Sequence, residues 1–222
     1  MGRQRLSSFS EPQVRCQTGT AALKDELREF GIAGFVAHED IQPTREWHDE
    51  IVNALASMDG LAALMTEDFD TSDWTDQEIG FAFAREVPII AVRIGEKGVY
   101  PYGFIGRFQA LSRSRETCTE AIVKILIKEE RMFNAYVDAL RNCGSFDEGN
   151  RLSKALPGIQ ALSDQQIDAL VAVFNENPQL QGSYGFNGAS RLEYGPGLTH
   201  YLNQLGLRQF QRTAEWLIEP VG

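Results

Sequence analysis

Three short apolar runs limit what this chain can fold into. They lie at residues 32–37, 60–65 and 87–94, and the last is an almost continuous β-branched run. Runs of this kind are typical of strands that are buried on both faces of a parallel sheet. Stretches with helical spacing of apolar residues separate them across short polar connections. Strands that alternate with helices in this way predict an α/β fold, with a mostly parallel sheet and helices on both faces.

The first two predicted helices have clear core faces. Leu23, Leu27 and Phe30 recur at i, i+4 and i+7, and Gly31 follows where a left-handed residue would cap the helix. Thr44 can cap the second helix. The core face of that helix is formed by Trp47, Ile51, Leu55 and Met58.

The helix before the third run carries a carboxylate on an apolar stripe. Trp74, Glu78 and Ala82 fall at i, i+4 and i+8, and almost every later side chain of this helix is apolar or small. The helix therefore has little solvent face for Glu78, so we expect its carboxylate to be either paired or functional, because carboxylates in such places are over-represented at active sites. If the carboxylate of Glu78 is paired and has only a structural role, its partner would be an arginine such as Arg85 or Arg93. Spacing alone leaves both interpretations open.

Composition excludes several classes of function. The chain has 222 residues, 21 Lys and Arg against 31 Asp and Glu, and a net charge of −10, so its surface repels phosphate backbones and direct nucleic-acid binding is not expected. Three widely spaced cysteines without a Cys-x-x-Cys pair fit a reducing cytoplasm. The three histidines do not cluster with cysteines, so no metal site is predicted. Neither a membrane span nor an export signal is predicted.

The α/β unit is expected to close with a helix. After the third run, residues 107–111 could form a short edge strand, and Thr117 with Glu120 has the spacing of a capping box. This box opens one long predicted helix that continues through Leu140. The unit would then end near Asn142.

The remaining residues predict a small, mainly helical appendage. Ser145 with Glu148 and Ser163 with Gln166 have capping-box spacing, so each pair predicts a helix, and the glycine- and aromatic-rich residues 181–197 predict loops. The predicted organisation is an atypical N-terminal segment, an α/β domain and a helical and loop-rich region. Their ranges are 1–20, 21–143 and 144–222.

The order of these elements, and the residues that form them, resemble the TIR domain, particularly its bacterial form. The resemblance covers about residues 21–140. Its most specific element is the pair Trp74 and Glu78, four residues apart, shortly before Val87-Pro-Ile-Ile. The family has a flavodoxin-like sheet, so the resemblance implies a mostly parallel sheet of that type.

The resemblance also implies an activity. Enzymatic members cleave the bond between nicotinamide and ribose in NAD, using the glutamate that aligns with Glu78. The implied function is that of an NAD glycohydrolase, which releases nicotinamide and ADP-ribose or a cyclic ADP-ribose. NAD would be the substrate, and no cofactor is implied. Bacterial proteins of this kind resemble antiphage defence effectors, so we expect a cytoplasmic enzyme that self-assembly activates.

The resemblance assigns further residues to the nucleotide site. Trp74, one turn before Glu78, would form a wall of the pocket, although a tryptophan at such a position is more often a core residue. Trp47 and the loop at residues 38–46, which contains Asp40 and Ile41, correspond to the segment that closes over the nucleotide and meets a neighbouring subunit. Arg45 could contact a phosphate or simply be solvated.

The sequence departs from the family pattern at its start. The family normally begins with an apolar strand of the type Val-Phe-Ile-Ser-His, directly before the first helix. Here residues 1–19 are polar, contain Pro12 and show no convincing strand. Only residues 6–10 could supply a short substitute. Two other functions therefore stay open: a non-catalytic TIR scaffold, and an enzyme similar to a nucleoside deoxyribosyltransferase, which has a similar sheet.

Overall fold

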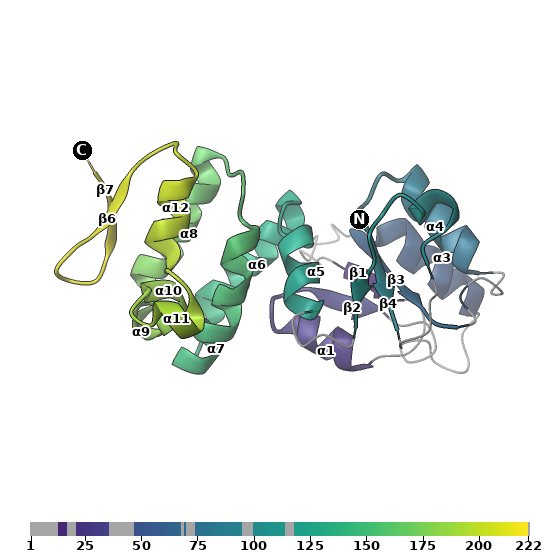
Figure 1. Cartoon of the computed structure of the whole chain (residues 1–222), viewed down its shortest axis with the longest axis horizontal. Helices are drawn as coiled ribbons and strands as arrows, with labels where there is room; N and C mark the ends of the chain where they lie inside the picture. Colours follow the sequence, from purple (N-terminus) through teal and green to yellow (C-terminus); the bar gives the residue numbers. More distant parts are fainter. Residues whose placement is uncertain are drawn as a thin grey trace, which may run out of the picture.

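The computed structural model of the chain describes residues 13–16, 21–35, 47–67, 69, 74–94, 100–113 and 118–221. They form a five-stranded sheet in the order β2-β1-β3-β4-β5, in which every neighbouring pair is parallel. The predicted mixed α/β fold is therefore confirmed (Figure 1). The strands are β1 (Gln13–Cys16), β2 (Ala33–Phe35), β3 (Gly60–Met65), β4 (Ile89–Arg93) and β5 (Leu111–Ser112).

The central strand β1 corrects the sequence prediction for the N-terminal segment. Residues 1–19 were expected to hold no convincing strand except a substitute at residues 6–10, which lie outside the described residues. The strand lies at Gln13–Cys16 instead, and it pairs with β2 on one edge and β3 on the other. Backbone hydrogen bonds on both edges can hold a strand in which Val14 is the one β-branched residue. Pro12 precedes the strand, so it removes no donor from the ladder.

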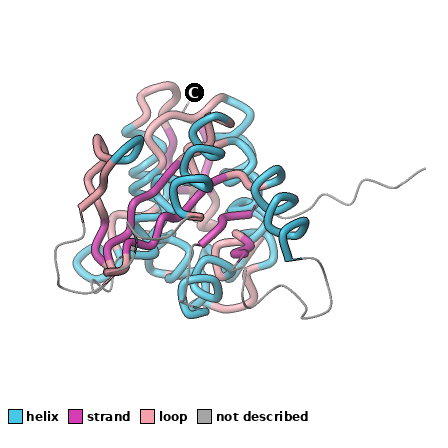
Figure 2. Tube along the Cα trace, turned by 90° about the vertical axis from the view of Figure 1, so that its right-hand side faces the viewer, coloured by secondary structure: helices cyan, strands magenta, loops and turns pink. Residues whose placement is uncertain are grey.

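Helices cover both faces of the sheet, and the side chains of β3 alternate between them. Ala62 and Leu64 pack toward α1 (Ala21–Arg28) and α5 (Cys118–Leu126). The other residues of β3 pack toward α3 (Trp47–Ser57) and α4 (Thr75–Ala84). Seen from the end of the molecule that holds the sheet, the strands run between helices (Figure 2). Residues buried on both faces explain why β3 reads as one continuous apolar run.

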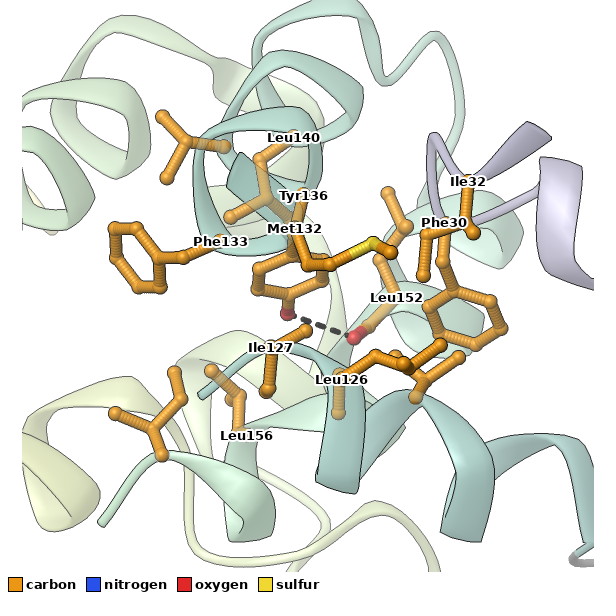
Figure 3. Close-up of a cluster of buried hydrophobic side chains, with 14 of the residues drawn as sticks. Phe30, Ile32, Leu126, Ile127, Met132, Phe133, Tyr136, Leu140, Leu152 and Leu156 are labelled. Carbon is orange, nitrogen blue, oxygen red and sulfur yellow. Dashed lines mark hydrogen bonds between the residues drawn. The ribbon is translucent and has the colours of Figure 1, made fainter. Parts of the chain in front are cut away.

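The predicted long helix is two helices, which corrects the sequence prediction. The chain leaves α5 at Leu126 and re-enters a helix, α6 (Glu130–Asn142), after a turn in which Glu129 is extended. Neither glycine nor proline occurs in this turn. The break instead lets Leu126 and Met132 enter the same core from different directions, and both are fully buried (Figure 3).

The C-terminal residues fold onto α6 and continue the core of the sheet. Two predicted capping boxes lie at helix starts: the Ser145 hydroxyl accepts from the Glu148 amide, and Ser163 forms a complete box with Gln166. A hairpin that the sequence did not predict ends the chain at the far end of the molecule from the sheet (Figure 1). The elements are α7 (Phe146–Leu152), the 3-10 helix η3 (Ser153–Gly158), α8 (Asp164–Glu176), α9 (Pro178–Gly182), α10 (Tyr184–Asn187), α11 (Arg191–Tyr194), α12 (Leu198–Gln204), β6 (Phe210–Arg212) and β7 (Ile218–Pro220).

The glycine-rich residues 181–197 are not only loops, as was expected, because α9, α10 and α11 lie there. Two glycines explain the difference. A Cβ on Gly182 would lie 2.4 Å from the Phe146 ring, and one on Gly185 would lie 1.8 Å from the Ser153 hydroxyl. These glycines let short helices pack in close contact. Composition alone does not show whether a glycine serves such a contact or a flexible loop. In the part of the chain that the structure describes, no helix has the length and apolar character of a membrane span.

Candidate active site at the carboxyl edge of the sheet

The strand order places a topological switch point between β1 and β3. From β1 the chain moves outward to β2, and then returns to β3 on the other side of β1. In open α/β sheets, ligands bind outside the carboxyl ends of the strands at such a point. The segments that follow β2, β3 and β4 all leave from this carboxyl edge because the strands are parallel. The edge is therefore the first place to look for a functional site.

Helix α4 brings Glu78 to this edge. The helix connects β3 to the parallel strand β4, so it runs back along the sheet and begins at the carboxyl end of β3. Glu78 lies in the first turn, and its amide donates to the Trp74 carbonyl at 2.9 Å. A carboxylate in the first turn is favoured by the positive end of the helix dipole.

The Glu78 side chain is buried. It is 4% exposed, and among the residues that the structure describes it is the one charged side chain that is buried. Thr75, Ile79 and Ala82 form the rest of the buried face of α4, which agrees with the predicted apolar stripe. Buried carboxylates are over-represented at functional sites, so Glu78 is a candidate site residue.

Aromatic contacts fix the amino end of α4. The Tyr102 hydroxyl donates to Asp76 Oδ1 at 2.9 Å, and the Tyr102 ring lies edge-on to Phe69 with centroids 6.0 Å apart. Ile105, in the 3-10 helix η2 (Gly103–Ile105), is fully buried against the same cluster. These contacts hold the first turn of α4, which carries Glu78, against the residues before η2 and the adjoining core.

Neither arginine suggested by the sequence pairs with Glu78. Arg85 Nη1 donates to the carbonyls of Leu55 at 2.8 Å and Met58 at 2.6 Å, so it caps the end of α3. Arg93 forms no ion pair with Glu78, and its Nε is buried without a hydrogen-bond partner. Neither Arg85 nor Arg93 is therefore the salt-bridge partner of Glu78.

Arg93 is a candidate site residue that sequence analysis did not assign to a ligand. It ends β4, directly beside Met65 at the end of β3. Ala91, two residues earlier, packs in the cluster under α4, so Arg93 belongs to the same face of the sheet. A buried donor without a partner calls for an explanation, and an incoming ligand supplies one. The sequence feature that could have indicated this residue is its position, as a single arginine near the end of the third apolar run.

The structure brings together only part of the predicted site. Trp74 precedes α4, is half-buried and belongs to neither core cluster. Trp47 begins α3, which also starts at the carboxyl edge because it follows β2, although its side chain lies outside the described residues. Asp40, Ile41 and Arg45 lie outside the described residues as well. No group of three metal-ligating side chains occurs within the described ranges.

A second feature lies at the opposite end of α4. A hollow of about 670 Å³ is lined by the start of β4, the residues before β5 and the end of α5, and Glu78 is not part of it. β5 pairs only with Val92 and Arg93, so no described strand covers Ile89–Ala91 on that side. Phe81 and Phe83 of α4 are 38% and 40% exposed. The expectation that α4 has little solvent-exposed surface is therefore wrong, because the helix covers an outer part of the sheet.

A network between Glu26 and Arg113 joins α1 to the strand β5. Arg113 donates to both carboxylate oxygens of Glu26, at 2.7 and 3.1 Å, and the Thr119 hydroxyl also donates to Glu26. Burial alone would raise the pKa of Glu26, but these hydrogen bonds outweigh burial and hold the pKa below its ordinary value. The network ties helices to the sheet and is structural.

Comparison with known proteins identifies the family of this fold. Residues 16–126 match the family model of the TIR domain, from the last residue of β1 to the last residue of α5. The chain belongs to the TIR-domain family. The sequence-based resemblance to this family is thereby confirmed, and the C-terminal helices from α6 onward lie outside the match. Glu78 and Arg93 both lie within the TIR domain.

Other comparisons add little to this assignment. A solved structure similar to this chain is the TIR domain of the Toll-related receptor TRR-2 from Hydra magnipapillata. The two are 16% identical, the match covers 53% of this chain and 98% of the other, and the TM-score is 0.43. No match was found among curated proteins.

Proposed function

We propose that this TIR domain is an NAD glycohydrolase, which cleaves the bond between nicotinamide and ribose, and that Glu78 is its catalytic carboxylate. The products are nicotinamide and ADP-ribose or a cyclic ADP-ribose. The observation that carries the proposal is the burial of the Glu78 carboxylate at the carboxyl edge of the sheet, beside the switch point, where it is the one charged side chain that is buried among the described residues. Membership of a family that includes NAD-cleaving enzymes supports it.

The chemistry of NAD suits a single carboxylate. Nicotinamide is already a cationic leaving group, so its departure needs no strong general acid and leaves a ribosyl centre with oxocarbenium character, as in other glycoside cleavages. A carboxylate held against apolar side chains acts on this positive charge more strongly than one in water. Glu78 can therefore stabilise the ribosyl cation, or hold a ribose hydroxyl, in a low-dielectric environment.

Other residues of the edge would hold the rest of NAD. Arg93 is suited to the diphosphate because its buried Nε has no protein partner and a guanidinium binds phosphate oxygens well. Trp74 and Trp47 would provide aromatic surface for the nicotinamide and its ribose. Asp40, Ile41 and Arg45 would close over the bound nucleotide.

The test is incubation of the purified full chain with NAD, with the products separated by chromatography. The unmodified protein should release nicotinamide, and Glu78→Gln should abolish the release, because the amide has the shape of the carboxylate without its charge. Glu176→Gln is the matched control, since Glu176 is exposed at the end of α8, outside the TIR match. Undiminished NAD cleavage by a folded Glu78→Gln variant would rule out the proposed role.

We further propose that the enzyme acts in the cytoplasm as an antiphage effector and that self-assembly through the loop at residues 38–46 activates it. The exposed Phe83, which lines the hollow at the start of β4, gives a neighbouring copy apolar surface to contact. NAD cleavage per mole of protein should then rise with protein concentration. Cleavage that is strictly proportional to concentration over the whole range would contradict activation by assembly.

A second candidate function is a non-catalytic TIR interaction module. The same hollow of about 670 Å³ and the uncovered edge of β4 favour it, because both suit contact with a second copy of this chain. This function predicts dimers or filaments in sedimentation experiments, without loss of NAD at any protein concentration. Phe83→Asp should disperse such assemblies.

A further inference from the structure

A pocket in the C-terminal region, outside the TIR match, has unusual polar walls. It measures about 310 Å³ and lies between the end of α10, the start of α12 and strand β6. The residues that line it and carry the argument are Asn187, Gly188, Gly197, Thr199, His200 and Arg212. It is far from Glu78 along the fold, because the hairpin that carries Arg212 ends the chain opposite the sheet (Figure 1).

Arg212 has a positive charge that no described carboxylate balances. Its Nη1 donates to the Asn187 carbonyl at 2.8 Å, and its guanidinium stacks 4.4 Å from the centre of the Trp216 ring. Its Nε and Nη2 are both buried without a hydrogen-bond partner. Among the described residues, no acidic side chain lies within ion-pair distance of Arg212. Burial also lowers the pKa of Arg212, as expected for a cation that lacks an anionic partner.

The unused donors have the geometry of an anion-binding fork. Nε and Nη2 lie along one edge of the planar guanidinium, the edge that binds two oxygens of a carboxylate or phosphate at once. The hydroxyl of Thr199, another residue that lines the pocket, is also buried without a partner. Three unsatisfied polar atoms around one pocket are costly in a folded protein unless something occupies it.

Two glycines let the backbone segments that line this pocket come into close contact. Gly188 and Gly197 both have positive φ values, of 71° and 87°. A Cβ on Gly188 would lie 2.4 Å from the Pro196 carbonyl oxygen, and one on Gly197 would lie 2.7 Å from the Gly188 amide nitrogen. The two segments therefore meet backbone to backbone, which only glycine allows at these positions.

Arg208 shows that the absence of a described carboxylate partner is particular to Arg212 and not general to this segment. Four residues before Arg212, its Nη2 donates to Asp168 Oδ1 at 2.7 Å. Arg208 therefore has a carboxylate partner, whereas Arg212 has none among the described residues. With a net charge of −10 the protein as a whole repels anions, so attraction at a single site must come from local donors.

We propose that this pocket binds a small molecule through a phosphate or carboxylate group, with the Nε and Nη2 edge of Arg212 and the Thr199 hydroxyl as donors. The anion satisfies all three unpartnered atoms and balances the guanidinium charge. The site is independent of NAD cleavage, because it uses none of the residues at the carboxyl edge of the sheet.

The experiment titrates the full chain with sodium phosphate and, separately, with sodium acetate, at constant ionic strength set with sodium chloride. Calorimetry measures binding, and the ¹⁵N NMR signals of the arginine Nε atoms report whether an arginine accepts the ligand. Saturable binding of phosphate identifies a phosphate site, and saturable binding of acetate identifies a carboxylate site. If neither probe binds saturably and no Nε signal moves, the proposal is overturned.

Variants test whether the anion binds at the Nε and Nη2 edge of Arg212. Arg212→Gln should weaken binding at least about tenfold, because it removes a charge-assisted bidentate contact. Arg212→Lys should also weaken it, since an ammonium keeps the charge without the planar fork. Arg208→Gln, the matched control, should bind as the unmodified protein does. Equal binding by Arg212→Gln and the unmodified protein would overturn the assignment.

If Arg212→Gln does not fold, Thr199→Val decides the question. This variant keeps the arginine and the shape of the side chain but removes the hydroxyl donor. Binding should weaken by about threefold to tenfold, the usual effect of losing one hydrogen bond. Unchanged binding by Thr199→Val, with no movement of an arginine Nε signal in the unmodified protein, contradicts the site.

Discussion

The α/β region buries a carboxylate, whereas the C-terminal helical region buries two nitrogen atoms of a partly exposed arginine. In the first, Glu78 lies at the carboxyl edge of a parallel sheet. In the second, two donors of Arg212 are buried beside a pocket without a carboxylate partner. The two regions nevertheless share one continuous hydrophobic cluster, which runs from α1 and the sheet through α5 and α6 to the hairpin. One core can therefore support two separate polar sites.

The side chains of α6 form the joint between the regions. Tyr136 of α6 is buried between Phe30 and Leu156, and Phe133 lies in the same cluster on the side away from Phe30 (Figure 3). The Tyr136 hydroxyl donates to the Leu152 carbonyl at 2.8 Å, the dashed line in the figure. A shared core of this kind predicts that neither region unfolds alone.

The largest expected effect tests this joint. Phe133→Ala should lower the free energy of unfolding by about 3–5 kcal/mol, because it leaves a cavity in the shared core. Far-UV and near-UV circular dichroism should report one common transition in denaturant. Leu207→Ala, at an exposed position, should change stability by less than about 1 kcal/mol. Two separate transitions would show that the regions are energetically independent.

A smaller change at the same joint isolates its hydrogen bond. Tyr136→Phe should cost about 1–3 kcal/mol of unfolding free energy, since the buried Leu152 carbonyl loses its side-chain donor while the ring stays in place. Chemical denaturation measures the loss. Tyr100→Phe is the control, because Tyr100 is exposed and its hydroxyl remains in solvent. An unchanged midpoint for Tyr136→Phe would mean that this bond adds nothing to the joint.

A third prediction separates the two polar sites. If the diphosphate of NAD contacts Arg93, then Arg93→Gln should raise KM for NAD by about tenfold and leave the response of the Arg212 pocket to phosphate unchanged. Steady-state kinetics and calorimetry measure the two effects. Arg28→Gln, on the exposed face of α1, should change neither quantity. Equal losses at both sites would indicate that they are coupled.

The smallest effect concerns the pH dependence of the α/β region. The pKa of Glu26 is held below its ordinary value, so its ion pair with Arg113 stabilises the fold above about pH 4.5 and is lost as pH falls through the lowered pKa. Because Glu26 is 42% exposed, the contribution should be below about 1 kcal/mol. The stability difference between the unmodified protein and Glu26→Gln should therefore disappear in acid. A difference that grows in acid would reverse the assigned sign.

The α/β region was more predictable from sequence than the C-terminal region. β3 lies at the predicted residues 60–65, and β4 lies within the predicted run, because strands buried on both faces must be apolar at nearly every position. The buried stripe of α4 followed from helical spacing in the same way. In the C-terminal region, only the helix starts at Ser145 and Ser163 carried comparable signals, because a capping box is local in sequence.

Sequence by itself thus determined the succession of β3, α4 and β4, the family, and the burial of Glu78 on an apolar helix face. The tertiary structure decided where β1 lies, because backbone pairing with β2 and β3 needs no special side chains. It also decided the break between α5 and α6, where burial on two sides outweighs helix propensity. The site at Arg212 depends on Asn187, 25 residues earlier. Local periodicity records which side chains are buried, but only the folded chain determines which distant groups meet.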